Sequence, residues 1–265
     1  MLAHLLRTDA PRHRPLPGNS EEAQVIAVLA QAHRDAVGER LRDVGKLRSL
    51  LREFFPAALT AFPNLATNAA LTILAAAPTP VTAAALTRTD LTDLLATTGR
   101  GVRQSEVGRL ARVFAAVQLR QPPGVEEAMG IAARALVRTI REDNAAIGDL
   151  ETALAAHFDD HPDAEILRSL PGLGVVLGAR VLGEFGDDRT RYANAASRCC
   201  YAGTAPVTRA SGKSRVVLQR RVRNQQLGES CRWSAPRICS SVSVATDAGP
   251  APGQQLQRID SCWAL

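Results

Sequence analysis

Two serines near the carboxyl end of the chain lie among basic side chains. Ser211 and Ser214 have Arg209, Lys213 and Arg215 as close neighbours in the sequence. A serine hydroxyl attacks a phosphate most readily where nearby cations stabilise the negative charge that develops. These residue types therefore predict a serine nucleophile that acts on a phosphodiester. The Gly-Lys-Ser triplet is not a P-loop, because the earlier glycine and the preceding buried strand are missing.

The same stretch belongs to a longer basic segment that has no acidic residue. Between residues 189 and 228 there is no Asp or Glu. The basic residues of this segment are Arg189, Arg191, Arg198, Arg209, Lys213, Arg215, Arg220, Arg221 and Arg223. An arginine-rich gene would add arginines without removing acids, so the one-sided charge favours contacts with nucleic-acid phosphates. The residues predicted to bind are Arg209, Lys213, Arg215, Arg220, Arg221 and Arg223.

Upstream of the basic segment, residues 166–182 have the pattern of a helix-hairpin-helix. Gly172 and Gly174 follow Leu170 and Pro171, and small residues follow at 178 and 179. The two glycines allow a tight turn and a close approach to a phosphate, and the next helix offers its free N–H groups. We expect Gly172 and Gly174 to hold the nucleic-acid backbone without reading its sequence.

The remaining chain is expected to be mainly α. Apolar residues recur every three or four positions over residues 19–55 and again over 125–158. Asn19, with Glu22 three residues later, is a predicted N-cap. Two amphipathic helices of this length predict an antiparallel helical hairpin or coiled coil, with a bundle of short helices formed by residues 57–121.

The sequence gives little support for a metal site or a membrane-spanning segment. The five cysteines match no zinc pattern and indicate reduced thiols in a cytoplasmic protein. They are Cys199, Cys200, Cys231, Cys239 and Cys262. Residues 157–163, with two histidines and three aspartates, are interpreted as a polar linker and not as a metal site. No stretch approaches the roughly 18 apolar residues of a membrane span, so no membrane contact is expected.

The motifs together resemble the C-terminal domain of the IS110-type transposases. The resemblance is carried by LRSLPGLGVVLGARVLGEFGD (167–187) and YAGTAPVTRASGKSRVV (201–217). Residues 5–17 and 47–62 are similar to the same family, so the resemblance covers about residues 1–228. It implies a recombinase that cuts and joins DNA through a serine–DNA intermediate. Ser211 matches the serine of the family motif, and Ser214 is the alternative.

The resemblance also implies partners and a cofactor. Family members have an N-terminal RuvC-like domain, whose four acidic residues bind a divalent metal such as Mg. Some members use a structured guide RNA, and the long helices imply a homo-oligomer. The RuvC-like domain should precede residue 5, so we expect this chain to hold no metal and to be a truncated remnant that is inactive alone.

Four segments follow from this interpretation. Residues 1–18 are a connector, 19–160 the helical region, 161–230 the transposase C-terminal domain, and 231–265 a disordered or frameshifted tail without helical or strand periodicity. Two other functions stay open at this point. One is a non-enzymatic helix-hairpin-helix module that binds nucleic acid, and the other is a helical dimerisation fragment.

Overall fold

The structure, a computed structural model, describes most of the chain between residues 18 and 227. The described residues are 7–8, 18–99, 101–118, 120–170, 172–205, 207–212, 214–218 and 220–227. The predicted tail, most of the predicted connector, and Lys213 lie outside these residues. Predictions about them stay predictions.

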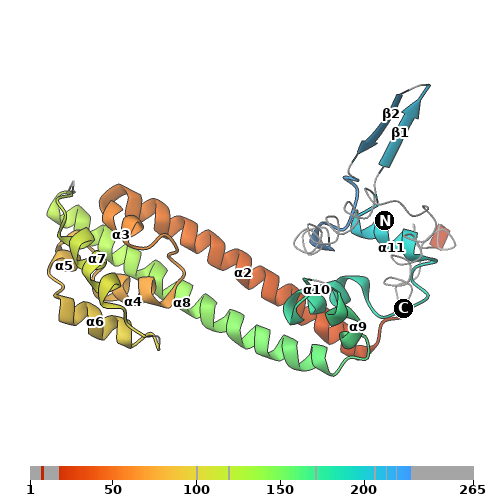
Figure 1. Ribbon diagram of the computed structural model, residues 1–265, viewed down its shortest axis with the longest axis horizontal. Coiled ribbons are helices and arrows are strands. Elements are labelled where there is room, and N and C mark those ends of the chain that lie inside the picture. The colour runs from red at the N-terminus through yellow and green to blue at the C-terminus, as the bar shows by residue number, and fades with distance from the viewer. Residues whose placement is uncertain are drawn as a thin grey trace. The chain divides into compact units, whose positions relative to one another are not determined.

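Helices dominate the described chain (Figure 1), which confirms a mainly α fold. The helices are α2 (Glu21–Phe54), α3 (Pro56–Ala61), α4 (Asn68–Ala76), α5 (Pro80–Ala84), α6 (Arg88–Ala96), α7 (Gln104–Ala115), α8 (Pro123–Asp159), α9 (Ala164–Ser169), α10 (Val175–Phe185) and α11 (Ala195–Ala202). Two strands follow, β1 (Val207–Ser211) and β2 (Ser214–Leu218). None of the helices in the described chain is both long enough and apolar enough to cross a membrane.

The start of α2 differs from the prediction. The backbone N–H of Ala23 donates to Ser20 Oγ at 3.1 Å, so Ser20 caps the helix and the prediction of Asn19 was wrong. Asn19 instead packs against Gly186, where its side chain leaves no room for a Cβ. Asn19 and Ser20 are both of a residue type that caps helices well. The contact of Asn19 with Gly186, far away in the sequence, leaves Ser20 as the cap.

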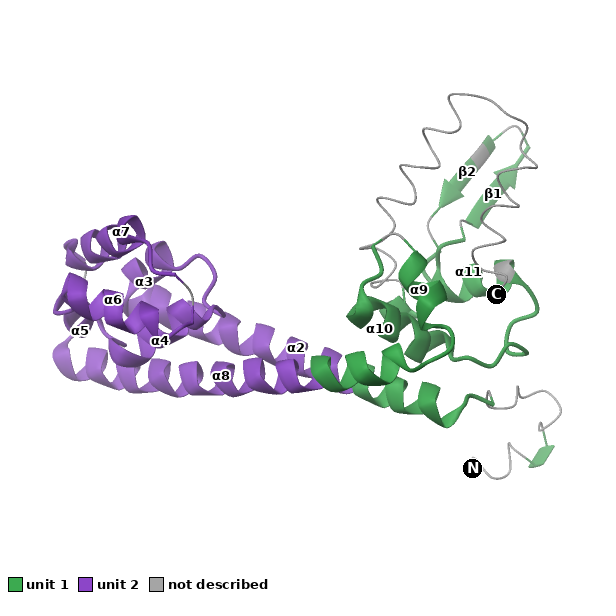
Figure 2. Ribbon diagram, turned by 60° about the horizontal axis from the view of Figure 1, so that its bottom comes forward, with its two compact units in different colours: residues 1–31, 151–265 green, residues 32–150 purple. Residues whose placement is uncertain are grey.

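Residues 32–150 form one compact unit, unit 2 in Figure 2. Arg40 of α2 donates to Asn144 Oδ1 of α8 at 3.1 Å, while the Gln121 amide, just before α8, donates to the Glu53 carbonyl at 3.1 Å. These two contacts show that the helices run in opposite directions in this unit. Their apolar residues share one core with the short helices; the core includes Leu47, Leu51, Phe54, Leu71, Ile73, Leu91, Leu110, Phe114, Val137 and Ile140.

A polar position interrupts the packing of α2 against α8. The Oδ2 atom of Asp143 is buried and has no hydrogen-bond partner among the described residues. Burial raises the pKa of Asp143 above its ordinary value, and the nearby carboxylates of Asp43 and Glu39 raise it further, although Arg40 opposes them. The charge of Asp143 therefore opposes the packing of unit 2.

The described parts of residues 1–31 and 151–265 form the other unit, unit 1 in Figure 2. Each of the two long helices is thus divided between the two units. The predicted domain boundary, between residues 160 and 161, instead placed both long helices entirely in one domain. Within this unit α10 packs on the long helices through glycines. A Cβ at Gly178 would lie 2.7 Å from Phe158 Cζ of α8, and one at Gly183 would lie 2.9 Å from Ala27 Cα of α2. The small residue that the sequence pattern places at 178 therefore lies against α8.

Candidate nucleic-acid interface

The two glycines predicted to bind phosphate, both in the turn between α9 and α10, have different backbone conformations. Gly172 has φ of 86°, a left-handed conformation that favours glycine. Gly174 is the N-cap of α10 with φ of −76° and ψ of 177°, which any residue adopts. A Cβ at Gly174 would meet nothing within 4 Å, and no side chain caps the helix there. Gly172 therefore shapes the turn, and Gly174 leaves the start of α10 open.

The far end of α10 holds the start of α2. The Gly18 N–H donates to Asp188 Oδ2 at 2.9 Å, and the Ser20 N–H donates to Asp187 Oδ1 at 3.0 Å. Burial raises the pKa of Asp187, but the hydrogen bonds from Ser20 and the charge of His161 lower it more, so the net shift is downward. Hydrogen bonds from Thr190 and Gly18 lower the pKa of Asp188. Asp187 and Asp188, the acidic turn, thus bind the end of α10 to the start of α2. The basic segment begins directly after this turn.

His161, in the predicted polar linker, is buried and contacts neighbouring residues of the protein. It is 5% exposed, its Nδ1 accepts the Asp163 N–H at 3.1 Å, and its Nε2 lies 3.5 Å from Asp187 Oδ2. In the same linker Asp159 pairs with Arg168. Within the described ranges, no three His, Cys, Asp or Glu side chains gather as ligands of a metal ion.

The first arginines of the basic segment are engaged within the protein. Arg191 donates to the Phe185 carbonyl at 2.8 Å and to the Tyr201 hydroxyl at 3.3 Å. Its guanidinium lies 5.3 Å from the ring centroids of both Tyr192 and Tyr201. Arg191 therefore closes the end of α10 and stabilises an aromatic cluster, a role that the count of positive charges did not reveal.

Two neighbouring arginines also have intramolecular contacts. Arg189 lies 3.8 Å from Asp163, and the guanidinium of Arg198 lies 5.7 Å from the Tyr192 ring centroid. The charge of the segment before β1 is thus partly offset by an acid from outside it. In the hairpin and after it, Arg209 and Arg221 are exposed.

A polar network anchors the chain that follows the hairpin. The Asn224 amide donates to Glu184 Oε2 at 2.7 Å and to the Tyr201 hydroxyl at 3.1 Å. Gly203, with φ of 75°, has the side chain of Arg223 against it and no room for a Cβ. Arg223 is thus half-buried at the base of the hairpin, whereas Arg221 is exposed.

The predicted serines lie in a β-hairpin, an element that the sequence analysis missed. β1 and β2 pair antiparallel, and Ser211 is the direct partner of Ser214 across a turn of two residues. Gly212, the first turn residue, has φ of 56°, as tight hairpin turns require. That glycine, between two short stretches of strand-forming residues, was the available signal.

Partners across the ladder share a face of the hairpin. Arg209 is opposite Val216, and Ser211 is opposite Ser214. Residues two apart on a strand point to the same side, so Arg209 and both serines lie on one face. Arg215 is paired with Ala210, and its side chain, like Lys213, lies outside the described part of the chain.

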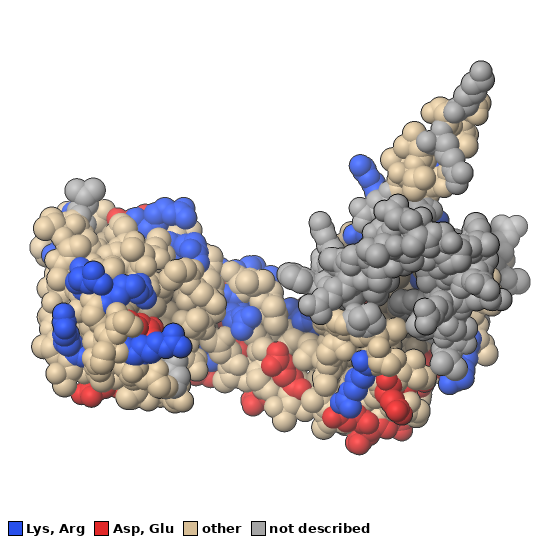
Figure 3. Space-filling view, in the orientation of Figure 1, with Lys and Arg blue, Asp and Glu red and all other residues tan. Residues whose placement is uncertain are grey.

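Both serines are exposed. Neither hydroxyl has an Asp, Glu or His partner among the described residues, so no general base is in place there to take the serine proton. In Figure 3 the described part of the hairpin shows no acidic side chain on the visible face. The described part of the hairpin therefore exposes two hydroxyls and the Arg209 guanidinium, with no acid or histidine beside the hydroxyls.

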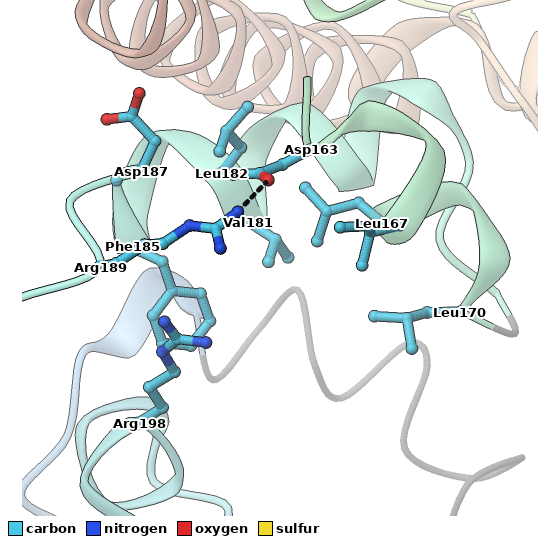
Figure 4. A pocket seen from close by; sticks show the side chains of 11 residues that line it. Asp163, Leu167, Leu170, Val181, Leu182, Phe185, Asp187, Arg189 and Arg198 are labelled. Atoms are coloured by element: carbon cyan, nitrogen blue, oxygen red, sulfur yellow. Dashed lines mark ion pairs between the residues drawn. The ribbon is translucent and has the colours of Figure 1, made fainter. Parts of the chain in front are cut away.

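A hollow with about 650 Å³ of empty space, part of it open to solvent, lies between α9 and α10 in the same unit. Figure 4 shows Leu167 and Leu170 on one side, Val181 and Phe185 on another, and Arg189 reaching towards Asp163. Its largely aliphatic lining suits an apolar group better than a phosphate. None of the predicted site residues lines it.

Comparison with known proteins places this unit in a family. Residues 164–228 match the model of the transposase IS116/IS110/IS902 family. Over 232 residues the chain is 47% identical to a mini-circle protein of Streptomyces coelicolor, whose name describes it as a candidate transposase for IS117; the match covers 86% of this chain and 56% of that protein.

Two further relatives are more distant. One is an uncharacterized 42 kDa protein of insertion element IS900 from Mycobacterium paratuberculosis, with 30% identity over 88% of this chain and 57% of that protein. The other is an uncharacterized 44.8 kDa protein of IS116 from Streptomyces clavuligerus, with 30% identity over 80% of this chain and 51% of that protein. No solved structure matches the chain. The chain spans about half the length of these relatives and belongs to the IS110 family of insertion-sequence transposases.

Proposed function

We propose that this chain carries the serine-bearing, nucleic-acid-binding part of an IS110-type transposase and that its partner is DNA. The observation that supports this most is the pairing of Ser211 with Ser214 at the tip of an exposed hairpin, with Arg209 on the same face. A phosphate bound at this face would contact a hydroxyl and a guanidinium together, which is the arrangement that phosphoryl transfer to serine needs.

In the proposed reaction Ser211 Oγ forms a bond to a DNA phosphorus while the bond from that phosphorus to one deoxyribose oxygen breaks. The serine proton passes to a base, and the leaving oxygen takes up a proton. Arg209 would stabilise the developing charge, joined by Lys213. Arg215 is paired with Ala210 at a register position of the opposite face, so it would bind a different phosphate from the one that Ser211 attacks. Arg220, Arg221 and Arg223 would hold phosphates near the hairpin base, and Gly172 and Gly174 would hold backbone as a helix-hairpin-helix. Ser214 is the alternative nucleophile.

The divalent metal of the family does not fit the described residues. No group of three suitable ligands gathers there, so no step is derived through a metal. Because the serines have no base among these residues and the leaving oxygen of ordinary DNA also needs a proton, we expect this chain by itself to bind ordinary DNA without cleaving it. A structured guide RNA and association through the long helices remain part of the proposal.

A second candidate function, a binding module without catalysis, is favoured by the same absence of a base at the described serines. The experiment that separates the two uses DNA with a bridging phosphorothiolate, whose sulfur leaves without needing a proton. The enzyme proposal predicts a covalent adduct on Ser211 that is lost in Ser211→Ala, while the variant binds DNA within about twofold of the parent. Binding without any adduct, at every position of the sulfur, would favour the binding module.

A further inference from the structure

The hairpin exposes apolar side chains that the proposed chemistry does not use. Val216 is 48% exposed and Val217 is 59% exposed, and Leu218 beside them is 41% exposed. Adjacent exposed apolar residues usually mark a surface that another molecule covers. A hairpin of two strands is also marginally stable in water when nothing packs on it. Phosphate contacts alone do not account for this composition.

The register divides these residues between the two faces. Val216 is opposite Arg209 and therefore lies on the face with Ser211 and Ser214. Val217 is opposite Thr208 on the other face. Any molecule that brings a phosphate to the serines also comes against Val216, about 7 Å further along the strand.

Charge indicates what covers the serine-bearing face. No acidic residue occurs between 189 and 228, and Arg209 is exposed on this face. A second copy of the hairpin would bring its own arginines against these, whereas a nucleic acid brings complementary charge. The occupant that fits is therefore a polyanion with an apolar group near its phosphates.

Double-helical B-form DNA has these properties in its major groove. The groove is about 12 Å wide and admits a two-stranded ribbon, and thymine presents a methyl group there. The major groove of A-form RNA is too deep and narrow for side chains to reach the bases. We propose that the serine-bearing face of the hairpin enters the major groove of B-form DNA and that Val216 contacts a thymine methyl beside the bound phosphate. The inference rests on the proposed function and adds to it a base preference and the residue responsible.

The test compares two DNA duplexes that differ only in the methyl group. The full chain binds alternating dA–dT and alternating dA–dU duplexes of 30 base pairs at one fixed salt concentration, measured by fluorescence anisotropy. Burial of one methyl group predicts about fourfold tighter binding to the thymine duplex. A matching rA–rU duplex is predicted to bind more weakly than either.

Two matched variants locate the contact. Val216→Thr and Val217→Thr keep the β-branched shape that strands favour, so both hairpins are expected to form. Val216→Thr replaces one of the two methyl groups by a hydroxyl, so the prediction is that it reduces the difference between thymine and uracil while Val217→Thr keeps that difference. Unchanged circular dichroism and melting temperature confirm that both variants fold.

The results separate failure of the major-groove contact from failure of the proposed function. Salt-dependent binding with equal affinity for both DNA duplexes, or an equal effect of the two valine variants, overturns the major-groove contact and leaves the proposed function intact. RNA binding as tight as DNA binding also overturns it. If the chain binds none of the duplexes, the proposed function falls together with the inference.

Discussion

Ser211 lies directly opposite Ser214 in the last pair of the β1–β2 ladder. Directly opposed residues of an antiparallel pair have Cβ atoms about 5 Å apart, so one phosphate at this face is within reach of both hydroxyls. Position along the sequence therefore does not select the nucleophile. Mapping a covalent adduct to one serine does, which is why the adduct experiment includes Ser214→Ala beside Ser211→Ala.

Substitutions at the two glycines of the α9–α10 turn should have different effects, one on stability and the other on DNA binding. Gly172→Ala places a side chain at φ of 86° and is expected to destabilise unit 1 by about 1 kcal/mol. Gly174→Ala has an ordinary conformation and open space, so its melting temperature should match the parent. If the open start of α10 contacts phosphate, Gly174→Ala weakens DNA binding severalfold. Unchanged affinity in Gly174→Ala would remove the turn from the interface.

Asp143 is expected to limit the stability of unit 2. Burial, with Asp43 and Glu39, raises its pKa, so the folded state holds the proton more tightly than the unfolded state. Stability therefore rises as pH falls through the raised pKa, and the charged form is a cost at pH 7. Asp143→Asn should stabilise the protein by about 0.5 kcal/mol at neutral pH, measured by urea unfolding. A gain that persists undiminished at pH 3 would contradict this cause.

The acidic turn at the end of α10 gives the opposite dependence. The pKa values of Asp187 and Asp188 lie below their ordinary values, so their stabilisation is present above about pH 4, the unfolded value, and is lost as pH falls through the folded pKa values. The protection factors of the Ser20 and Ala23 amides, which correct for the pH dependence of intrinsic exchange, should fall on acidification more in the parent than in Asp187→Asn, where the contact is already weakened at pH 7. An equal fall in both proteins would show that this turn does not hold the start of α2.

Association through the long helices predicts a specific surface. Leu41 of α2 and Ile131 of α8 are 63% and 62% exposed in unit 2. Leu41→Glu or Ile131→Glu should shift the chain towards monomer in analytical ultracentrifugation, while Val81→Glu on α5, also exposed, serves as the control. A monomeric parent, or equal effects of all three variants, would contradict association through this surface.

The parts of the fold with a regular period were predictable. The three-and-four spacing of apolar residues gave α2 and α8 nearly to their ends, and Gly172 has the left-handed conformation that its pattern required. The hairpin was missed because both of its faces are open, so strands of five residues show no alternation of buried and exposed positions. A burial pattern exists only where a core imposes one.

The remaining misses are contacts between residues far apart in the chain. Asp187 and Asp188 accept backbone N–H groups from residues about 170 positions earlier, and no local spacing encodes such a pair. Arg191 is held by the Phe185 carbonyl and by two tyrosines. From its sequence neighbours alone it is indistinguishable from an arginine that binds phosphate.

The salt dependence of DNA binding by the full chain tests directly whether the serine-bearing hairpin contacts phosphates. The logarithm of the affinity should fall linearly with the logarithm of salt concentration, and Arg209→Ala should reduce that slope by about 1, as expected for one lost phosphate contact. Arg134→Ala, which removes an arginine of α8 that is also exposed, should leave the slope unchanged. An unaltered slope in Arg209→Ala, or an equal loss in Arg134→Ala, would contradict a nucleic-acid interface on the serine-bearing hairpin.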